Sequence, residues 1–255
     1  MSRTNWTAEQ LFTRLLHNKS DKTYWENIRE LRKRDGITAT CYTLAASGSD
    51  QEKELAVDVL AHLPYSEQKI TLYFELLQKG FAIRSVLYAI GHNNEQLNTA
   101  QINTIAAFKD HADKEIREAV AYALLGVDHM EAIHTLIALS MDKVSAIRSW
   151  AVFGIASRTE RNNPDIITAL WNRINDKHEE TRFEAIVGLA VRKDDRVKDI
   201  IKRELLTGDF GSLLFEAITE LGDNEFLPLL EAHLDDDADA GWLHELRECI
   251  DSLKG

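Results

Sequence analysis

Residues 142–155 read DKVSAIRSWAVFGI, and the spacing of their side chains predicts a helix that packs through one face. Counted from Arg148, the third, sixth and seventh residues are Ala151, Gly154 and Ile155. Residues at these separations lie on one side of an α-helix, because each turn takes 3.6 residues. Alanine and glycine are small, so we expect this helix to approach its neighbours closely.

The same pattern recurs in two other segments of the chain. One contains Arg117, in IREAVAYAL, and the other contains Arg182, in TRFEAIVGL. The arginines are separated by 31 and 34 residues, which is typical of repeats that each hold one pair of helices. Weaker copies start at Lys53 and Leu214, and around Arg84 the register shifts by one residue. Because a pair of short helices cannot bury its own apolar face, such pairs are expected to stack on one another.

Segments with helical periodicity also lie between these helices, and Pro164 suits the first turn of one of them. The pattern predicts an all-α fold, a right-handed α-solenoid of about eight stacked antiparallel helix pairs of roughly 32 residues each. We expect a single domain over residues 1–255. Residues 1–34 are predicted to form the N-terminal capping pair and residues 223–255 an acidic C-terminal capping pair.

The segments DKVSAIRSWAVFGI and DKHEETRFEAIVGL resemble HEAT repeats, in particular the short bacterial kind related to the phycobilin-lyase repeats. In that family, an aspartate at the turn between the helices stands six residues before an arginine of the second helix. Asp142 with Arg148 and Asp176 with Arg182 keep this spacing, and the resemblance covers most of the chain. We interpret both positions as structural: the carboxylate caps the second helix, and the arginine bridges to the turn of the next unit. Tetratricopeptide repeats would need a Trp, Leu-Gly and Tyr signature that these segments lack.

Composition argues against a disordered, an all-β or a membrane-spanning protein. Hydrophobic residues make up 44% of the chain and charged residues 28%, as in globular proteins. Only three prolines and 12 glycines occur, which favours helices over an all-β chain that needs many turn residues. No apolar run approaches the roughly 18 residues needed to span a membrane. The first ten residues lack the start of a signal peptide, so a cytoplasmic protein is expected. Cys41 and Cys249 have no metal-ligand spacing and are predicted to be buried, reduced thiols.

The charge of the chain argues against a nucleic acid partner. The net charge is −12, which repels a phosphate backbone. Residues 1–34 carry eight Lys and Arg against four Asp and Glu, whereas residues 221–255 carry two against ten. We interpret DDDADA, at 235–240, as a solvated turn between helices. A partner, if charged, is expected to be basic.

Two sequence features bear on catalysis. His178 with Glu179 and His244 with Glu245 are similar to the His-Glu pairs that hold two irons in HEAT-type deoxyhypusine hydroxylases, but that family needs four such pairs. DNA glycosylases on HEAT scaffolds use a basic groove, whereas the second helices here carry carboxylates. We therefore predict no catalytic residue, no metal and no cofactor. An enzyme of the phycobilin-lyase or DNA-glycosylase type is the alternative.

Aromatic side chains recur at positions one, two and five after the repeat arginines, which should face the concave side of the solenoid. Exposed aromatic anchors among charged residues are typical of protein-binding grooves. The predicted partner-binding residues are Tyr122, Trp150, Phe153, Phe183, Glu184, Val187, Phe215 and Glu216. The alternative is that strong curvature packs Trp150 and Phe153 against neighbouring second helices.

These observations together predict a non-catalytic scaffold that binds another protein in its concave face. One form of this interpretation is an immunity protein that neutralises a bacterial toxin, because a small acidic scaffold could cover a basic, nuclease-like surface. The identity of the partner and the oligomeric state stay open.

Overall fold

The computed structural model describes residues 3–18, 20–208, 210–234 and 239–255, and within these ranges every regular element is a helix. The predicted all-α fold class is confirmed. The chain divides into two compact units, Met1–Val127 and Asp128–Gly255. None of the helices in the described ranges has the length and apolar content required to cross a bilayer.

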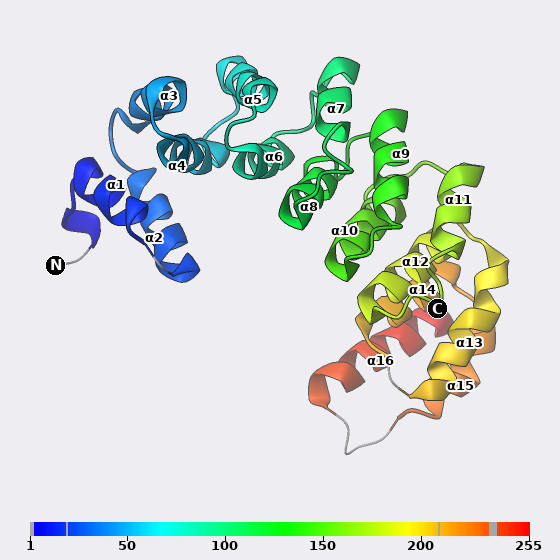
Figure 1. The fold of residues 1–255 in the computed structure, drawn as a ribbon. Coiled ribbons are helices and arrows are strands. Elements are labelled where there is room, and N and C mark those ends of the chain that lie inside the picture. The colour runs from blue at the N-terminus through cyan, green and yellow to red at the C-terminus, as the bar shows by residue number, and fades with distance from the viewer. Residues whose placement is uncertain (1–2, 19, 209, 235–238) are drawn as a thin grey trace. The chain divides into compact units, whose positions relative to one another are not determined.

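The first unit is a stack of helix pairs. Its α-helices are α1 (Ala8–Leu16), α2 (Asp21–Leu31), α3 (Ile37–Ser47), α4 (Asp50–Ala61), α5 (Glu67–Lys79), α6 (Ile83–Gly91), α7 (Thr99–Ala106) and α8 (Lys114–Ala123). Helix α6 packs between α4 and α8, while α3, α5 and α7 line the opposite side (Figure 1). We call α4, α6 and α8 the second helices of their pairs. Leu87 and Ile90 on α6 and Val120 on α8 are fully buried.

The second unit is also a stack of helix pairs. Its α-helices are α9 (Met130–Leu139), α10 (Ser145–Ala156), α11 (Pro164–Trp171), α12 (Glu179–Val191), α13 (Lys198–Thr207), α14 (Ser212–Leu221), α15 (Leu227–Glu231) and α16 (Ala240–Lys254). Helix α12 packs between α10 and α14, and α14 packs against α16 (Figure 1). The described residues thus hold sixteen α-helices, which agrees with the predicted eight pairs.

Side-chain caps set several helix starts. Thr7, Ser49 and Asn98 each form a capping box with the glutamine or glutamate three residues later. Asn163 accepts a hydrogen bond from the backbone N–H of Ile166, and Pro164 occupies the first position of α11, as predicted. Of the acidic segment 235–240, residues 235–238 lie outside the described ranges.

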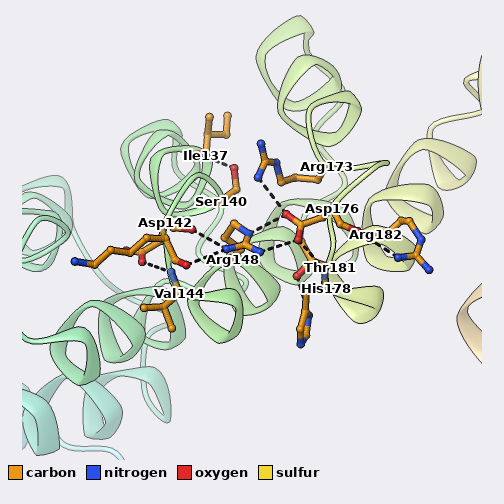
Figure 2. A network of polar contacts seen from close by, with 11 residues as sticks. Ile137, Ser140, Asp142, Val144, Arg148, Arg173, Asp176, His178, Thr181 and Arg182 are labelled. Carbon is orange, nitrogen blue, oxygen red and sulfur yellow. Dashed lines mark hydrogen bonds and ion pairs between the residues drawn. The ribbon is translucent and has the colours of Figure 1, made fainter.

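The predicted bridge from a repeat arginine to the next turn is confirmed for Arg148 (Figure 2). Its Nε and Nη2 donate to Asp176 Oδ2 and Oδ1 at 2.8 and 2.7 Å, and its Nη1 donates to the carbonyl oxygen of Asp142 at 2.9 Å. Arg182 differs, because its Nε donates to Glu204 Oε2 on α13, 3.3 Å away, and not to the turn before the next second helix. The arginine of one pair is therefore held by a carboxylate of the next.

The repeat aspartates bind the residue just before each second helix. Asp142 Oδ1 accepts a hydrogen bond from the backbone N–H of Val144 at 2.8 Å, and Asp176 Oδ1 accepts one from the N–H of His178 at 3.0 Å. Val144 and His178 are the N-cap residues of α10 and α12. The expected capping role thus takes a modified form, in which the carboxylate holds the N-cap residue instead of a first-turn N–H.

Both cysteines are buried free thiols, as predicted. Cys41 lies in α3 of the first unit and Cys249 in α16 of the second. Burial raises the pKa of Cys41 to about 12, so this group stays protonated at neutral pH.

Gly188 allows a close approach between α10 and α12. A Cβ at this position would stand 2.7 Å from Ala156 Cβ and 2.9 Å from Ala156 Cα. We expect Gly188→Ala to lower the free energy of unfolding by about 1 to 3 kcal/mol, because the two helices must move apart. Urea unfolding followed by circular dichroism measures this change. Gly188→Ala combined with Ala156→Gly is the control, since removing the Ala156 Cβ makes room for the new one and keeps one alanine and one glycine at the contact. Equal stability of the two variants would contradict the close approach.

Candidate functional site

Helix α10 of the second unit carries a pair of aromatic side chains that are partly exposed. Trp150 and Phe153 lie on α10, and their rings meet edge to face with centroids 6.2 Å apart. Trp150 is 37% exposed and Phe153 is half-buried. They border a pocket of about 390 Å³, here named the α10–α12 pocket, which is lined by Ala146, Ser149, Trp150, Phe153, His178, Glu180 and Glu184. Of the two aromatic side chains expected to be exposed on α10, Trp150 is therefore partly exposed and Phe153 is half-buried.

Four of the predicted partner-binding residues are instead buried, namely three apolar side chains and Glu184. Phe183 is 3% exposed, and Val187 and Phe215 are also buried, so the expectation that they face solvent is wrong. Both Phe183 and Val187 lie on α12, which packs between α10 and α14. Phe215 packs against the ring of Trp242 on α16, with centroids 5.7 Å apart. These side chains belong to the core of the second unit.

The two predicted glutamates have different surroundings. Glu216 is exposed, whereas Glu184 is buried and its Oε2 accepts a hydrogen bond from the hydroxyl of Ser157 at 3.3 Å. Burial raises the pKa of Glu184 to about 7, the charges of Glu216 and Glu180 act in the same direction, and the hydrogen bond from Ser157 opposes them. The negative charge of the α10–α12 pocket therefore changes near neutral pH.

The first unit carries a larger groove, of about 780 Å³, along α2, α4, α6 and α8. We name it the first-unit groove. Its aromatic lining residues are Tyr24, Trp25, Tyr88 and Tyr122, and the imidazoles of His62 and His92 also line it. Tyr122 is the one predicted site residue that lies here.

Ring contacts connect four of these side chains across the groove. The centroids of His62 and His92 are 4.2 Å apart, those of His92 and Tyr122 are 5.6 Å apart, and those of Tyr122 and Tyr88 are 5.3 Å apart. Gly91 makes room for this row, because a Cβ there would stand 2.5 Å from Tyr122 Cδ1. The row runs from the end of α4 to α8.

Two polar links position charged groups in the groove. The hydroxyl of Tyr24 donates to Asp58 Oδ2 at 2.6 Å, and Arg84 Nη1 donates to Glu115 Oε2 at 2.5 Å. Burial raises the pKa of Asp58, while the hydrogen bond from Tyr24 opposes that shift. The first link joins α2 to α4 and the second joins α6 to α8.

The sequence analysis missed most of this groove, although a signal was present. Counted from Lys53, Asp58 is the fifth residue and His62 the ninth. With the one-residue shift in α6, Tyr88 and His92 take the same two positions. A comparison of the fifth and ninth positions in these two units would have shown that Asp58, His62, Tyr88 and His92 occupy matching places in the repeat.

The two His-Glu pairs do not come together. His178 Nδ1 lies 3.1 Å from the hydroxyl of Thr181, and His244 lies 3.4 Å from Glu248 on the surface of α16. Among the described residues, no group of three or more His, Cys, Asp or Glu side chains is arranged to hold a metal ion.

Comparison with known proteins gives both a sequence relative and structural neighbours. No protein-family model matches the chain. A segment of 119 residues is 37% identical to protein YibA of Escherichia coli K12, and the same match is found in strain O157:H7. This segment is 47% of the chain and 42% of YibA, so the chain spans less than half the length of these relatives in sequence.

The crystal structure of Escherichia coli YibA matches with a TM-score of 0.75 at 25% identity, over 99% of this chain and 94% of YibA. The crystal structure of an engineered protein matches with a TM-score of 0.59 at 14% identity, over 97% of this chain and 78% of that one, which shows the fold alone. The closer likeness to the phycobilin-lyase type of repeat stays a prediction. The chain is an α-helical repeat protein with a fold similar to that of YibA.

Proposed function

We propose that this chain is a non-catalytic scaffold that binds another protein through the surface of its second helices. The observation that carries the proposal is Trp150, a large aromatic side chain that is 37% exposed beside Phe153 in the α10–α12 pocket. Tryptophan is enriched among the residues that dominate binding energy at protein interfaces. Stacked helix pairs also present extended surfaces that suit the binding of other proteins.

Charge around the α10–α12 pocket favours a basic partner. Glu180 and Glu184 line it, and Glu216 lies close enough to raise the pKa of Glu184. Carboxylates around an aromatic anchor accelerate association with a basic surface and orient it. A narrower form of the proposal is an immunity protein that covers the basic surface of a bacterial toxin, which the net charge of −12 supports.

The test is the removal of the tryptophan side chain. Trp150→Ala is expected to weaken binding of a partner isolated by crosslinking and mass spectrometry by about 2 kcal/mol, or about thirtyfold in Kd, because the anchor is lost. Its free energy of unfolding should fall by less than about 3 to 5 kcal/mol, the cost of emptying a fully buried aromatic site, since the side chain is partly exposed. Isothermal titration calorimetry with the purified partner measures the affinity.

Met141→Ala is the matched control for this test. Met141 is a large apolar residue that is 59% exposed and lies outside the α10–α12 pocket. Its removal should leave the affinity unchanged. If Trp150→Ala and Phe153→Ala both bind the partner as tightly as this control, the pocket is not the binding surface.

A further inference from the structure

We propose that the first-unit groove is a second binding site, which holds an extended polypeptide segment with arginine or lysine side chains between its aromatic row and its carboxylates. All residues that line the groove lie within the first unit. The site is separate from the α10–α12 pocket and does not depend on it.

The size of the groove suits an extended peptide. Its volume of about 780 Å³ is within the range of sites that enclose a ligand of several residues or rings. The groove crosses α4, α6 and α8, and packed helices lie about 8 to 10 Å apart. Two such spacings amount to roughly 16 to 20 Å, the length of about five or six extended residues.

The aromatic row supplies surfaces that attract cations. Tyr88 and Tyr122 are half-buried, with one part of each side chain accessible from the groove. The face of a tyrosine ring attracts an ammonium or guanidinium group, and a guanidinium also stacks on it. The ring contacts with His92 hold Tyr122 against α6, so this surface is in place before a ligand arrives.

Charge in the groove is mainly negative. Among the described residues that line it, five are carboxylates and one is an arginine, Arg84, which is paired with Glu115. Desolvation lowers the pKa of His62 to about 4 and also lowers the pKa of His92, so at neutral pH the imidazoles do not offset the negative charge. An anionic segment is repelled, and a purely apolar segment would remove water from the carboxylates without replacing its hydrogen bonds.

One of these carboxylates is positioned in advance. Tyr24 donates to Asp58 Oδ2 at 2.6 Å, which fixes the carboxylate at the boundary of α2 and α4. A group that is oriented before binding loses less conformational entropy when the ligand arrives. A basic side chain of a partner segment therefore meets an ordered acceptor beside ordered rings.

The experiment uses the full chain and two fluorescein-labelled octapeptides, one in which arginine alternates with leucine and one with glutamate in place of arginine. Fluorescence anisotropy measures binding. We expect the arginine peptide to bind at least about tenfold more tightly than the glutamate peptide, and added salt to weaken it. Glu54→Gln combined with Glu118→Gln should lower the affinity for the arginine peptide by about tenfold or more. Tyr122→Leu should lower this affinity too, and circular dichroism verifies that both variants fold.

A charge-matched control variant tests whether the peptide needs the groove itself or only the net charge of the chain. Glu75→Gln with Glu95→Gln removes the same charge from exposed positions outside the groove and should leave binding unchanged. An equal loss in this control would overturn the inference, because the peptide would then respond to net charge alone. Failure of the wild-type chain to prefer the arginine peptide would also overturn it. The inference would also be overturned if spermidine competed as effectively as unlabelled peptide, because the groove would then be a site for small cations.

Trp150→Ala distinguishes this inference from the proposed function. Peptide binding should be unaffected by Trp150→Ala, because the two sites lie in different units. If peptide binding is lost in Trp150→Ala and kept in the groove variants, the peptide binds the α10–α12 pocket. That result would overturn the inference about the groove while supporting the proposed function.

Discussion

Replacing Phe183 with alanine is expected to lower the free energy of unfolding by about 3 to 5 kcal/mol, the usual cost of emptying a buried aromatic site. The ring is 3% exposed, and the guanidinium carbon of Arg182 lies 4.8 Å from its centroid. The substitution therefore leaves a cavity between second helices and also removes a cation–π contact. The midpoint of urea unfolding, followed by circular dichroism at fixed protein concentration, measures the loss.

Trp150→Ala is the matched comparison, because it removes a larger ring from the neighbouring helix α10. Trp150 is partly exposed, so the loss there should be smaller than for Phe183→Ala. Similar losses in the two variants would show that both rings are packed to the same degree. In that case the assignment of Trp150 to a partner-binding surface on α10 would be wrong.

Replacing Asp176 with asparagine is also expected to cost about 3 to 5 kcal/mol of unfolding free energy. Its carboxylate side chain is 4% exposed and pairs with Arg148 at 2.7 Å and Arg173 at 3.1 Å. Asparagine has nearly the same shape but no charge, so two partly buried guanidinium groups lose their counterion. Asp195→Asn is the control, because that carboxylate is largely exposed and its pair with Lys198 is worth at most about 1 kcal/mol.

Acid should remove part of the same stabilisation in the wild-type chain. Hydrogen bonds from Arg148, together with the bond from His178 and the charge of Arg173, lower the pKa of Asp176 from 3.8 to about 2, against the opposing effect of burial. A carboxyl group with a lowered pKa stabilises the fold fully above its unfolded pKa, and this contribution is lost as pH falls through the folded pKa. The loss between about pH 4 and pH 2 should reach about 2 kcal/mol.

The pH dependence is measured by urea unfolding at several pH values in wild type and in Asp176→Asn. The difference between the two should shrink as pH falls below about 4, because the wild-type carboxyl becomes protonated. A difference that stays constant from about pH 6 to about pH 2 would contradict the charge pairing with Arg148.

The fold was predictable because its determinants are local and repeated. The spacing of 31 and 34 residues between the repeat arginines was enough to predict the helix pairs, and the six-residue spacing between Asp142 and Arg148, shared with HEAT repeats, led to the predicted bridge between turns. The partner of Arg182 was not predictable, because Glu204 comes from a helix without that spacing. Helical periodicity gives the direction of a side chain from its own axis, whereas contacts between helices depend on how the axes are placed.

The outcome at the candidate site has a different cause. Phe183 stands at position one after its arginine and Trp150 at position two, and adjacent positions point about 100° apart on a helix. Position one is buried at Ser149, Phe183 and Phe215, so positions one and two should not have been assigned to one face. The first-unit groove was missed for another reason: the repeats of α4 and α6 lack an arginine in the shared register, so their fifth and ninth positions were not compared.

The bonds between helix pairs also bear on how the chain is made in the cell. Arg148 and Asp176 are 28 residues apart, and Arg84 and Glu115 are 31 apart, so each bond closes a loop of about one repeat. Loops of this length cost little entropy to close, and proteins dominated by such short-range contacts fold rapidly. During synthesis on the ribosome, a helix pair can complete these bonds as soon as the next pair has emerged. The nascent chain does not have to wait for its far end before burying its apolar faces.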